Sequence, residues 1–219
     1  MDIIARGLTK RYFRKAGQSN YIDVIREMDV DLPAGALTVL TGRSGSGKTT
    51  LLSMLAGLLT PTAGTVAAGE TDLYQLDDPA LSRFRSAHIA VMSQGRAVLD
   101  ILNVRDNMLL GARMKDGGGP DLAKRLEALA ERFRMQDLLD AWPPELSGGE
   151  LRRVMLIRAL LTGADILLCD EPTGDLDGPM TALVLETLRE YARSGHAVLL
   201  VTHEAEADRY ADRRIALER

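Results

Sequence analysis

Cysteine, an excess of basic charge and long apolar runs are all scarce or absent in this 219-residue chain. Because Cys169 is the single cysteine, no internal disulfide can form, and a reducing compartment is expected. There are 27 Lys and Arg residues against 31 Asp and Glu, a net charge of −4. This balance argues against general nucleic-acid binding, which usually needs a basic face.

Neither a secretion signal nor a membrane span is visible in the sequence. The start, MDIIARGLTKRY, has no apolar signal core. No apolar stretch approaches the roughly 20 residues that cross a bilayer. We therefore expect a soluble protein on the cytoplasmic side, which would need another protein to anchor it if it acts at a membrane.

The order of apolar and polar segments predicts a single α/β domain over residues 1–219. Short apolar runs at 37–40, 166–169 and 197–201 are typical of central parallel strands that are buried on both faces. The first ~35 residues alternate more, and we expect an antiparallel edge of short strands there. Residues 79–162 are mostly helical in pattern, apart from a strand that ends near Met92. A helical subdomain is therefore predicted over about 93–162, between that strand and the one that starts near Ile166.

A glycine-rich loop follows the first apolar run. The stretch GRSGSGKT, with an apolar strand before it and a helix-like segment after it, fits the pattern G-x-x-x-x-G-K-[ST] in full. Its backbone N–H groups and the following helix N-terminus can hold an anion, its lysine can reach the outer phosphates of a nucleotide, and its threonine can bind Mg²⁺. The predicted nucleotide-binding residues are Gly42, Arg43, Ser44, Gly45, Ser46, Gly47, Lys48, Thr49 and Thr50.

Two further apolar runs end at polar residues. Asp170 and Glu171 follow the run at 166–169, and His203 follows the run at 197–201. Since the carboxyl ends of parallel strands meet at the ligand-binding edge of a sheet, we expect Asp170 to hold Mg²⁺ and Glu171 to act as the general base for an attacking water. His203 would bind the γ-phosphate or orient Glu171. His88 and His196 lack this setting and are interpreted as structural.

The segment DLDG at 175–178 superficially matches a GTPase motif. However, no N-K-x-D guanine-recognition motif occurs in the chain, and the aspartate comes far too late after the glycine-rich loop. A GTPase is therefore excluded.

A second pair of glycines occurs in LSGGELRRV. Ser147 and Glu150 form an S-x-x-E capping box, which accounts for the start of a helix. Capping does not account for Gly148 and Gly149 in the first turn, each of which costs about 1 kcal/mol relative to alanine. Bare backbone N–H groups at a helix N-terminus indicate a second phosphate-binding end.

Together, GRSGSGKT, Gln94 in VMSQG, LSGGE, ILLCDEP, TGDLD and His203 resemble the ATPase subunit of ABC transporters over essentially the whole chain. The resemblance implies a P-loop NTPase fold, ATP and Mg²⁺ as cofactors, and a head-to-tail dimer, with a second identical subunit or a paralogue. In such a dimer Ser147, Gly148 and Gly149 would contact ATP held by the partner. It also implies integral membrane permease subunits as partners, no nucleic acid, and a peripheral location on the cytoplasmic face of the inner membrane.

Other roles carry over singly from this resemblance. Tyr12 corresponds to the aromatic residue that stacks on adenine, although Phe13 is adjacent and a core position for Tyr12 is the alternative. Gln94 would sense Mg²⁺ and water, so the expected catalytic set is Glu171, His203, Lys48 and Gln94, and the expected metal set is Thr49, Gln94 and Asp170. The loop around Asp177 would couple the two sites. The segment 97–108 would receive the permease, or else pack inside the helical subdomain.

The segment LSGGE corresponds to the signature motif of the family. The sequence departs from the family pattern at Glu150, where a glutamine is usual, and it lacks the common polar pair after this signature. Neither departure affects Lys48, Asp170, Glu171 or His203, so hydrolysis is expected. The details most resemble the branch of macrolide exporters, lipoprotein-releasing systems and the cell-division ABC pair. An importer ATPase for amino acids or other small solutes is the first alternative. A soluble ABC ATPase acting on DNA or ribosomes is the second, although this chain has neither the coiled-coil insertion nor the second cassette of such proteins.

Overall fold

A parallel sheet forms the centre of the protein in a computed structural model that describes residues 1–13, 21–116 and 119–217. Its strands lie in the order β6–β7–β8–β3–β9, and all of its pairings are parallel. The three apolar runs form β3, β7 and β8 in the middle of this sheet, as predicted from the sequence. The five strands are β3 (Leu37–Gly42), β6 (Ile89–Met92), β7 (Ile166–Asp170), β8 (Ala197–Val201) and β9 (Arg213–Leu217).

The central strands are mainly apolar because both of their faces are covered. Successive side chains of a strand point to opposite faces. Leu167 and Cys169 accordingly pack in one hydrophobic cluster, with the residues of α5 and α6, whereas Ile166 and Leu168 pack in the other, with α1 and the antiparallel sheet. Every residue of β7 and β8 is buried.

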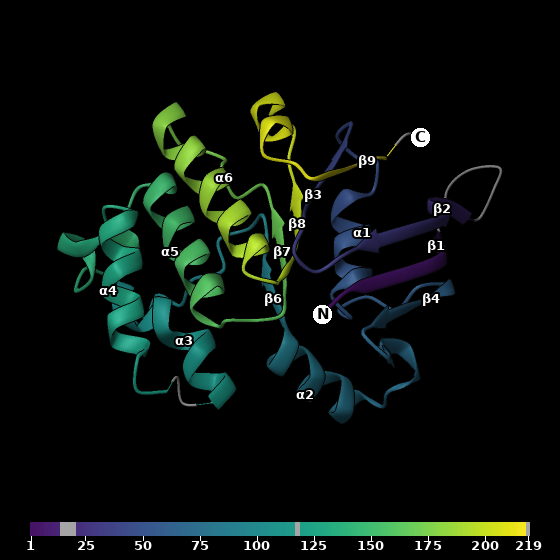
Figure 1. Ribbon diagram of the computed structural model, residues 1–219, viewed down its shortest axis with the longest axis horizontal. Helices are drawn as coiled ribbons and strands as arrows, with labels where there is room; N and C mark the ends of the chain where they lie inside the picture. The colour runs from purple at the N-terminus through teal and green to yellow at the C-terminus, as the bar shows by residue number, and fades with distance from the viewer. Residues whose placement is uncertain (14–20, 117–118, 218–219) are drawn as a thin grey trace.

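The helices divide between the two faces of the sheet. In Figure 1, α3, α4, α5 and α6 lie on one side, and α1 lies on the other side beside the antiparallel strands. Helices α3 to α5 fall inside the predicted helical subdomain. The six helices are α1 (Lys48–Leu55), α2 (Asp78–His88), α3 (Val104–Asp116), α4 (Leu122–Arg132), α5 (Gly148–Leu161) and α6 (Gly178–Arg193), and short 3₁₀ turns occur at Leu73–Gln75, Gln136–Leu138, Pro143–Glu145 and Ala205–Arg209.

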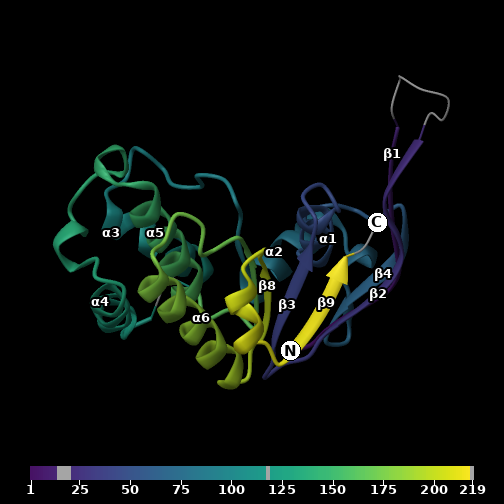
Figure 2. The ribbon, with the colours of Figure 1, turned by 90° about the horizontal axis from the view of Figure 1, so that it is seen from above.

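The N-terminal region forms an antiparallel sheet in the order β2–β1–β4–β5. The prediction of an antiparallel edge is confirmed, but the prediction of short strands is wrong for the first two. The punctuating Pro33 and Gly35 follow β2 rather than interrupt it, and register shifts within β1 accommodate its irregularities. Figure 2 shows the ends of β1 and β2 projecting from the body. The strands are β1 (Ile3–Phe13), β2 (Tyr21–Leu32), β4 (Ala63–Ala68) and β5 (Thr71–Asp72).

None of the helices in the described part of the chain combines the length and the apolar character needed to cross a bilayer.

Candidate functional site

The glycine-rich loop connects β3 to the first turn of α1. Gly47, the N-cap of α1, has a φ of 104°, a left-handed conformation that favours glycine. A Cβ at this position would also lie 2.9 Å from Ile25 Cδ1. The Lys48 ammonium donates hydrogen bonds to the carbonyls of Gly42 (2.8 Å) and Arg43 (3.2 Å), so it lies over the loop. A cation and the N-terminus of a helix therefore face the same space, as anion binding requires.

A cavity of about 530 Å³ opens in front of this loop. Of the predicted loop residues, Arg43 and Ser46 do not line it; Ser46 is buried, and its hydroxyl has no hydrogen-bond partner in the described part of the chain. Gln94, Asp170, Glu171 and His203 reach the cavity from the ends of other strands. The lining residues are Val24, Gly42, Ser44, Gly45, Gly47, Lys48, Thr49, Thr50, Gln94, Arg152, Asp170, Glu171, Gly174, Asp175 and His203.

Thr49 and Asp170 meet at the floor of the cavity. The Thr49 hydroxyl donates a hydrogen bond of 2.7 Å to Asp170 Oδ2. The Asp170 carboxylate is 2% exposed, and burial raises its pKa, although the bond from Thr49 opposes that rise. Two hard oxygen donors side by side fit Mg²⁺, which usually takes one or two carboxylates and completes its shell with water and substrate phosphates. The described residues contain no cluster of three or more His, Cys, Asp or Glu side chains that could hold a metal ion.

Glu171 and His203 form a pair at the mouth of the cavity. Nδ1 of His203 lies 3.0 Å from both carboxylate oxygens of Glu171. Glu171 has a φ of 52°, unusual for a residue with a side chain, and its N–H donates to the Val201 carbonyl of β8. This conformation turns the chain sharply after β7. The hydrogen bond that the imidazole donates to Glu171, and the negative charge of that carboxylate, raise the pKa of His203. The predicted juxtaposition of these two side chains is thus present.

The strand register separates Tyr12 from Phe13. Tyr12 lies opposite Ile22 on β2, so these two side chains share a face, whereas Phe13 lies opposite Tyr21 on the other face. Val24, two residues after Ile22, lines the cavity and is adjacent to the phosphate loop. Tyr12 does not itself line the cavity, and it is 42% exposed. The alternative of a core position for Tyr12 is therefore not what the structure shows.

The signature residues Ser147, Gly148 and Gly149 line a different cavity, of about 630 Å³, rather than the one in front of Lys48. The predicted capping box is present: Ser147 Oγ accepts from the N–H of Glu150, and Glu150 Oε2 accepts from the N–H and the hydroxyl of Ser147. These bonds to Ser147 lower the pKa of Glu150. The N-terminus of α5 therefore borders a cavity other than the one in front of its own phosphate loop.

The loop between β7 and α6 packs on this helix tip. A Cβ on Gly149 would lie 2.9 Å from the carbonyl oxygen of Asp175, so close packing within one chain also requires this glycine. The sequence alone did not reveal this second reason for a glycine at position 149. Asp177, predicted to belong to the coupling loop, lines the second cavity and is the N-cap of α6, where its side chain accepts from the N–H of Met180.

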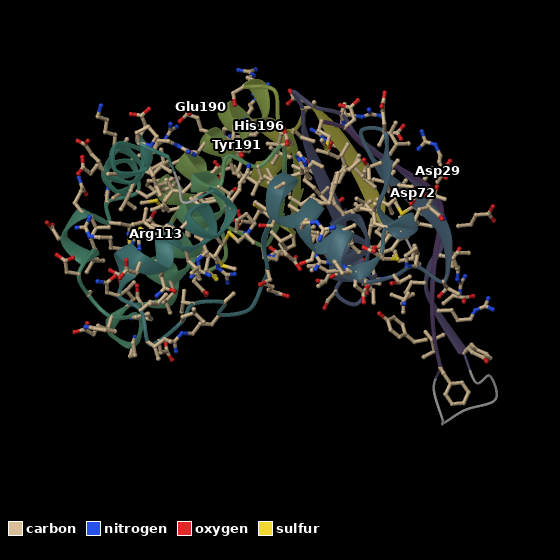
Figure 3. The ribbon with its side chains drawn as sticks, turned by 90° about the horizontal axis from the view of Figure 1, so that it is seen from below. Asp29, Asp72, Arg113, Glu190, Tyr191 and His196 are labelled. Atoms are coloured by element: carbon tan, nitrogen blue, oxygen red, sulfur yellow. The ribbon has the colours of Figure 1, made fainter. Side chains whose placement is uncertain are left out.

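Two side chains near the cavity were not singled out from the sequence. Arg152 lines the cavity in front of the phosphate loop, although it follows the signature on α5, and Asp175 lines both cavities. Asp175 falls within the motif TGDLD but was given no role at the cavity, and no local pattern places Arg152 there, because its position depends on how α5 packs against the rest of the chain. The histidines interpreted as structural lie elsewhere: His88 Nδ1 is 2.7 Å from Asp165, and His196 stacks on Tyr191 at 4.2 Å (Figure 3).

A groove of about 390 Å³ runs beside the end of β6, close to Gln94. Residues of α2, α3 and α5 line it, together with Met92, Ser93 and Ala97. Exposure varies along the apolar segment 97–108. Val104 and Met108 are buried in the helical subdomain, whereas Ile101 is 82% exposed.

The arrangement of these sites matches one family. Residues 25–174 match the model of the ABC transporter family. The chain belongs to the ABC transporter family. The family recognised in the sequence motifs is therefore confirmed, and so is the expected α/β fold.

The curated relatives are similar along nearly the whole of this cassette. It is 34% identical over 213 residues to macrolide export ATP-binding/permease protein MacB 2 of Aeromonas hydrophila, covering 97% of this chain and 32% of that protein. It is also 34% identical over 212 residues to MacB of Nitrosomonas europaea, with the same coverage of 97% and 32%. The chain thus spans about a third of the length of these relatives.

Solved structures show the same architecture. A bacterial ABC transporter cassette, solved as a dimer, superposes with a TM-score of 0.89 at 28% identity, covering 98% of this chain and 93% of that one. A second structure, an ATP-binding cassette dimer in a post-hydrolysis state bound to ADP and Pi, gives the same TM-score and identity over 99% of this chain and 94% of that one.

Proposed function

We propose that the chain binds ATP and hydrolyses it as one half of a head-to-tail dimer that drives a membrane permease. One observation carries this proposal. The phosphate loop, Asp170, Glu171 and His203 line one cavity, while Ser147 to Gly149 line another. The phosphate loop and the N-terminus of α5 are both anion-binding features, but they lie at separate cavities. Each cavity therefore holds half of an ATP site and lacks the other half, which its own chain does not bring to it. A second copy in the opposite orientation supplies both complements at once.

The residues of the first cavity suit phosphoryl transfer to water. Lys48 would exchange its two loop carbonyls for the outer phosphates of ATP. Thr49 and Asp170 would hold Mg²⁺, with Gln94 as a further candidate from the adjacent strand end, and the bound cation supplies neutralisation of phosphate charge. Glu171 would take the proton of the attacking water as the bond between the γ-phosphorus and the bridging oxygen of ADP breaks. His203 would hold Glu171 in place and then face the γ-phosphate.

The relatives support an export-type permease as the partner. Their names join an ATP-binding part to a permease part in one protein, and this chain corresponds to about a third of their length. The apolar groove beside the end of β6 is where we place the contact with a permease segment. Through that contact the cassette would act peripherally at the cytoplasmic face of the inner membrane.

Glu171→Gln tests the proposal because it keeps the size of the side chain and removes the base. The variant should bind Mg²⁺–ATP, lose turnover by at least about a hundredfold, and elute as a dimer with two ATP molecules in size-exclusion chromatography. Glu127→Gln, which changes an exposed carboxylate on α4 far from both cavities, is the matched control. Wild-type-like hydrolysis by Glu171→Gln, or a variant that remains monomeric with ATP bound even when the permease is present, would contradict the proposal.

A further inference from the structure

Arg152 occupies an unusual place for a charged side chain. It lies in the first turns of α5, five residues after Ser147, yet its side chain is only 13% exposed. Its Nη1 donates a hydrogen bond of 3.1 Å to the carbonyl of Gln94, and its Nη2 lies 3.7 Å from Asp175 Oδ2. One guanidinium thus reaches two segments that follow two different strands, β6 and β7.

The same guanidinium also packs on the loop between Glu171 and Asp175. A Cβ on Gly174 would lie 3.2 Å from Arg152 Nη2, which shows how closely the loop and the side chain approach. Arg152 further lines the cavity in front of the phosphate loop. The planar guanidinium presents five donors, so it can bond to a carbonyl and a carboxylate at the same time, which neither a neutral side chain nor a single ammonium matches in geometry.

These contacts place Arg152 between the two cavities of one chain. The N-terminus of its helix forms the second cavity, with Ser147, Gly148 and Gly149. Its side chain touches Gln94 and Asp175, both of which line the first cavity. A movement of Gln94 or of the 171–175 loop during the nucleotide cycle would therefore be transmitted to the tip of α5, and the reverse.

We propose that Arg152 is a positioning residue that couples the two ATP sites: it links the state of the first cavity of a chain to the signature helix that completes the partner's site. This inference rests on the proposed function, because it requires a dimer with composite sites. Arg152 bonds to the protein rather than to the substrate, so its loss is expected to affect cooperative turnover and not the binding of ATP to a single chain.

The experiment compares Arg152→Gln, Arg152→Lys and Asp175→Asn with wild type, using the full chain and, where hydrolysis needs it, the permease. Steady-state hydrolysis against ATP concentration gives kcat, apparent KM and the Hill coefficient. Titration calorimetry at concentrations where the protein is monomeric gives the dissociation constant for ATP. Arg132→Gln is the matched control, because Arg132 also links two elements through an ion pair, here with Glu190 on α6, and neither residue lines either cavity.

Arg152→Gln should lower kcat roughly tenfold and move the Hill coefficient toward one, with the monomeric dissociation constant within about twofold of wild type. Arg152→Lys should recover part of the loss. Combining Arg152→Gln with Asp175→Asn should cost less than the sum of the single changes, since both remove the same contact. Asp175→Asn keeps the test open if Arg152→Gln does not fold, since it removes the ionic half of the contact and nothing of the helix.

Two results would overturn the inference. One is an Arg152→Gln variant whose kcat and Hill coefficient match those of Arg132→Gln. The other is a loss that lies entirely in monomeric ATP affinity, because Arg152 would then be a ligand of its own nucleotide. Failure of the proposed function looks different: in that case the wild-type chain itself would neither hydrolyse ATP cooperatively nor form an ATP-dependent dimer.

Discussion

The α-carbon of Gly149 lies so close to Asp175 that a Cβ added to the glycine would be 2.9 Å from the Asp175 carbonyl oxygen. Gly148, one residue earlier, differs: its nearest neighbour would be Asp175 Oδ2 at 3.5 Å, an ordinary contact. Packing inside one chain therefore requires the second glycine of the signature but not the first. The first remains to be explained by what approaches the helix tip from outside the chain.

This difference predicts opposite behaviour of two matched alanine variants. Gly149→Ala should force the 171–177 loop away and cost about 1–3 kcal/mol, typical of overpacking, which lowers the Tm by roughly 2–10 °C for a chain of this size. Gly148→Ala should keep the wild-type Tm, because its Cβ meets no close atom. Thermal unfolding by circular dichroism measures both. Equal Tm values for the two variants would show that the loop yields without cost.

A larger side chain at Gly148 tests the role of the helix tip in the dimer. Gly148→Leu is expected to leave the dissociation constant of the protein monomer for ATP within about threefold of wild type. It should abolish the ATP-dependent dimer, because the leucine side chain would fill the second cavity. Size-exclusion chromatography in the Glu171→Gln background reports the dimer. A crosslink between residue 148 and Lys48 of the same chain would contradict the composite site.

The register of β1 and β2 predicts which aromatic ring contacts the adenine of ATP. Tyr12→Ala should raise the dissociation constant of ATP about tenfold, since base–aromatic stacking contributes roughly 1–3 kcal/mol. Phe13→Ala should change it less than about twofold, because that ring lies against Tyr21 on the opposite face. Calorimetry with ATP compares the pair. A larger loss of ATP affinity for Phe13→Ala than for Tyr12→Ala would mean that β1 and β2 present their other face to the nucleotide.

The contact between Glu171 and His203 predicts a pH effect of defined sign. The pKa of His203 is raised by its hydrogen bond to Glu171, so Glu171→Gln should bring it back toward about 6.5, its ordinary value. Because the pKa is higher in the folded chain, the stabilisation from the pair is complete below about pH 6.5 and is lost as pH rises through the raised pKa. NMR titration of the imidazole measures the shift. A His203 pKa that is the same in both proteins would show that the pair does not persist in solution.

A stability measurement checks the same sign independently. The difference in Tm between wild type and His203→Gln should be greatest at about pH 6 and should close as pH rises. The difference is expected to be small, since the His203 side chain is 75% exposed and water screens its charge.

The hydrogen bond between Thr49 and the buried Asp170 predicts the dependence on magnesium. Asp170→Asn keeps the size of the side chain but removes the charge, so Mg²⁺ should no longer tighten ATP binding, while binding without Mg²⁺ should stay within about threefold of wild type. Asp165→Asn is the matched control, because Asp165 lies just before β7, at the opposite end of the strand, and pairs with His88. Dissociation constants with and without Mg²⁺ decide the matter. An unchanged effect of Mg²⁺ in Asp170→Asn would remove this residue from the metal site.

The sequence by itself determined the features that depend on local order. The runs that became β3, β7 and β8 could be found because strands covered on both faces must be apolar at every position. The phosphate loop and the capping box could be found because a few consecutive residues, with their backbone, carry out the whole function. The polar residues that end β7 and β8 could be placed together because parallel strands end at one edge.

Tertiary structure decided whatever depended on how separate elements meet. Pairing between β1 and β2 put Tyr12 and Phe13 on opposite faces of the sheet, since a change of one residue in register moves a side chain to the other face. The 171–177 loop packs on α5 so closely that position 149 must be glycine, a requirement that does not come from the helix itself. The contacts of Arg152 with Gln94 and Asp175 join residues 58 and 23 positions apart, and no periodicity along the chain encodes such a meeting.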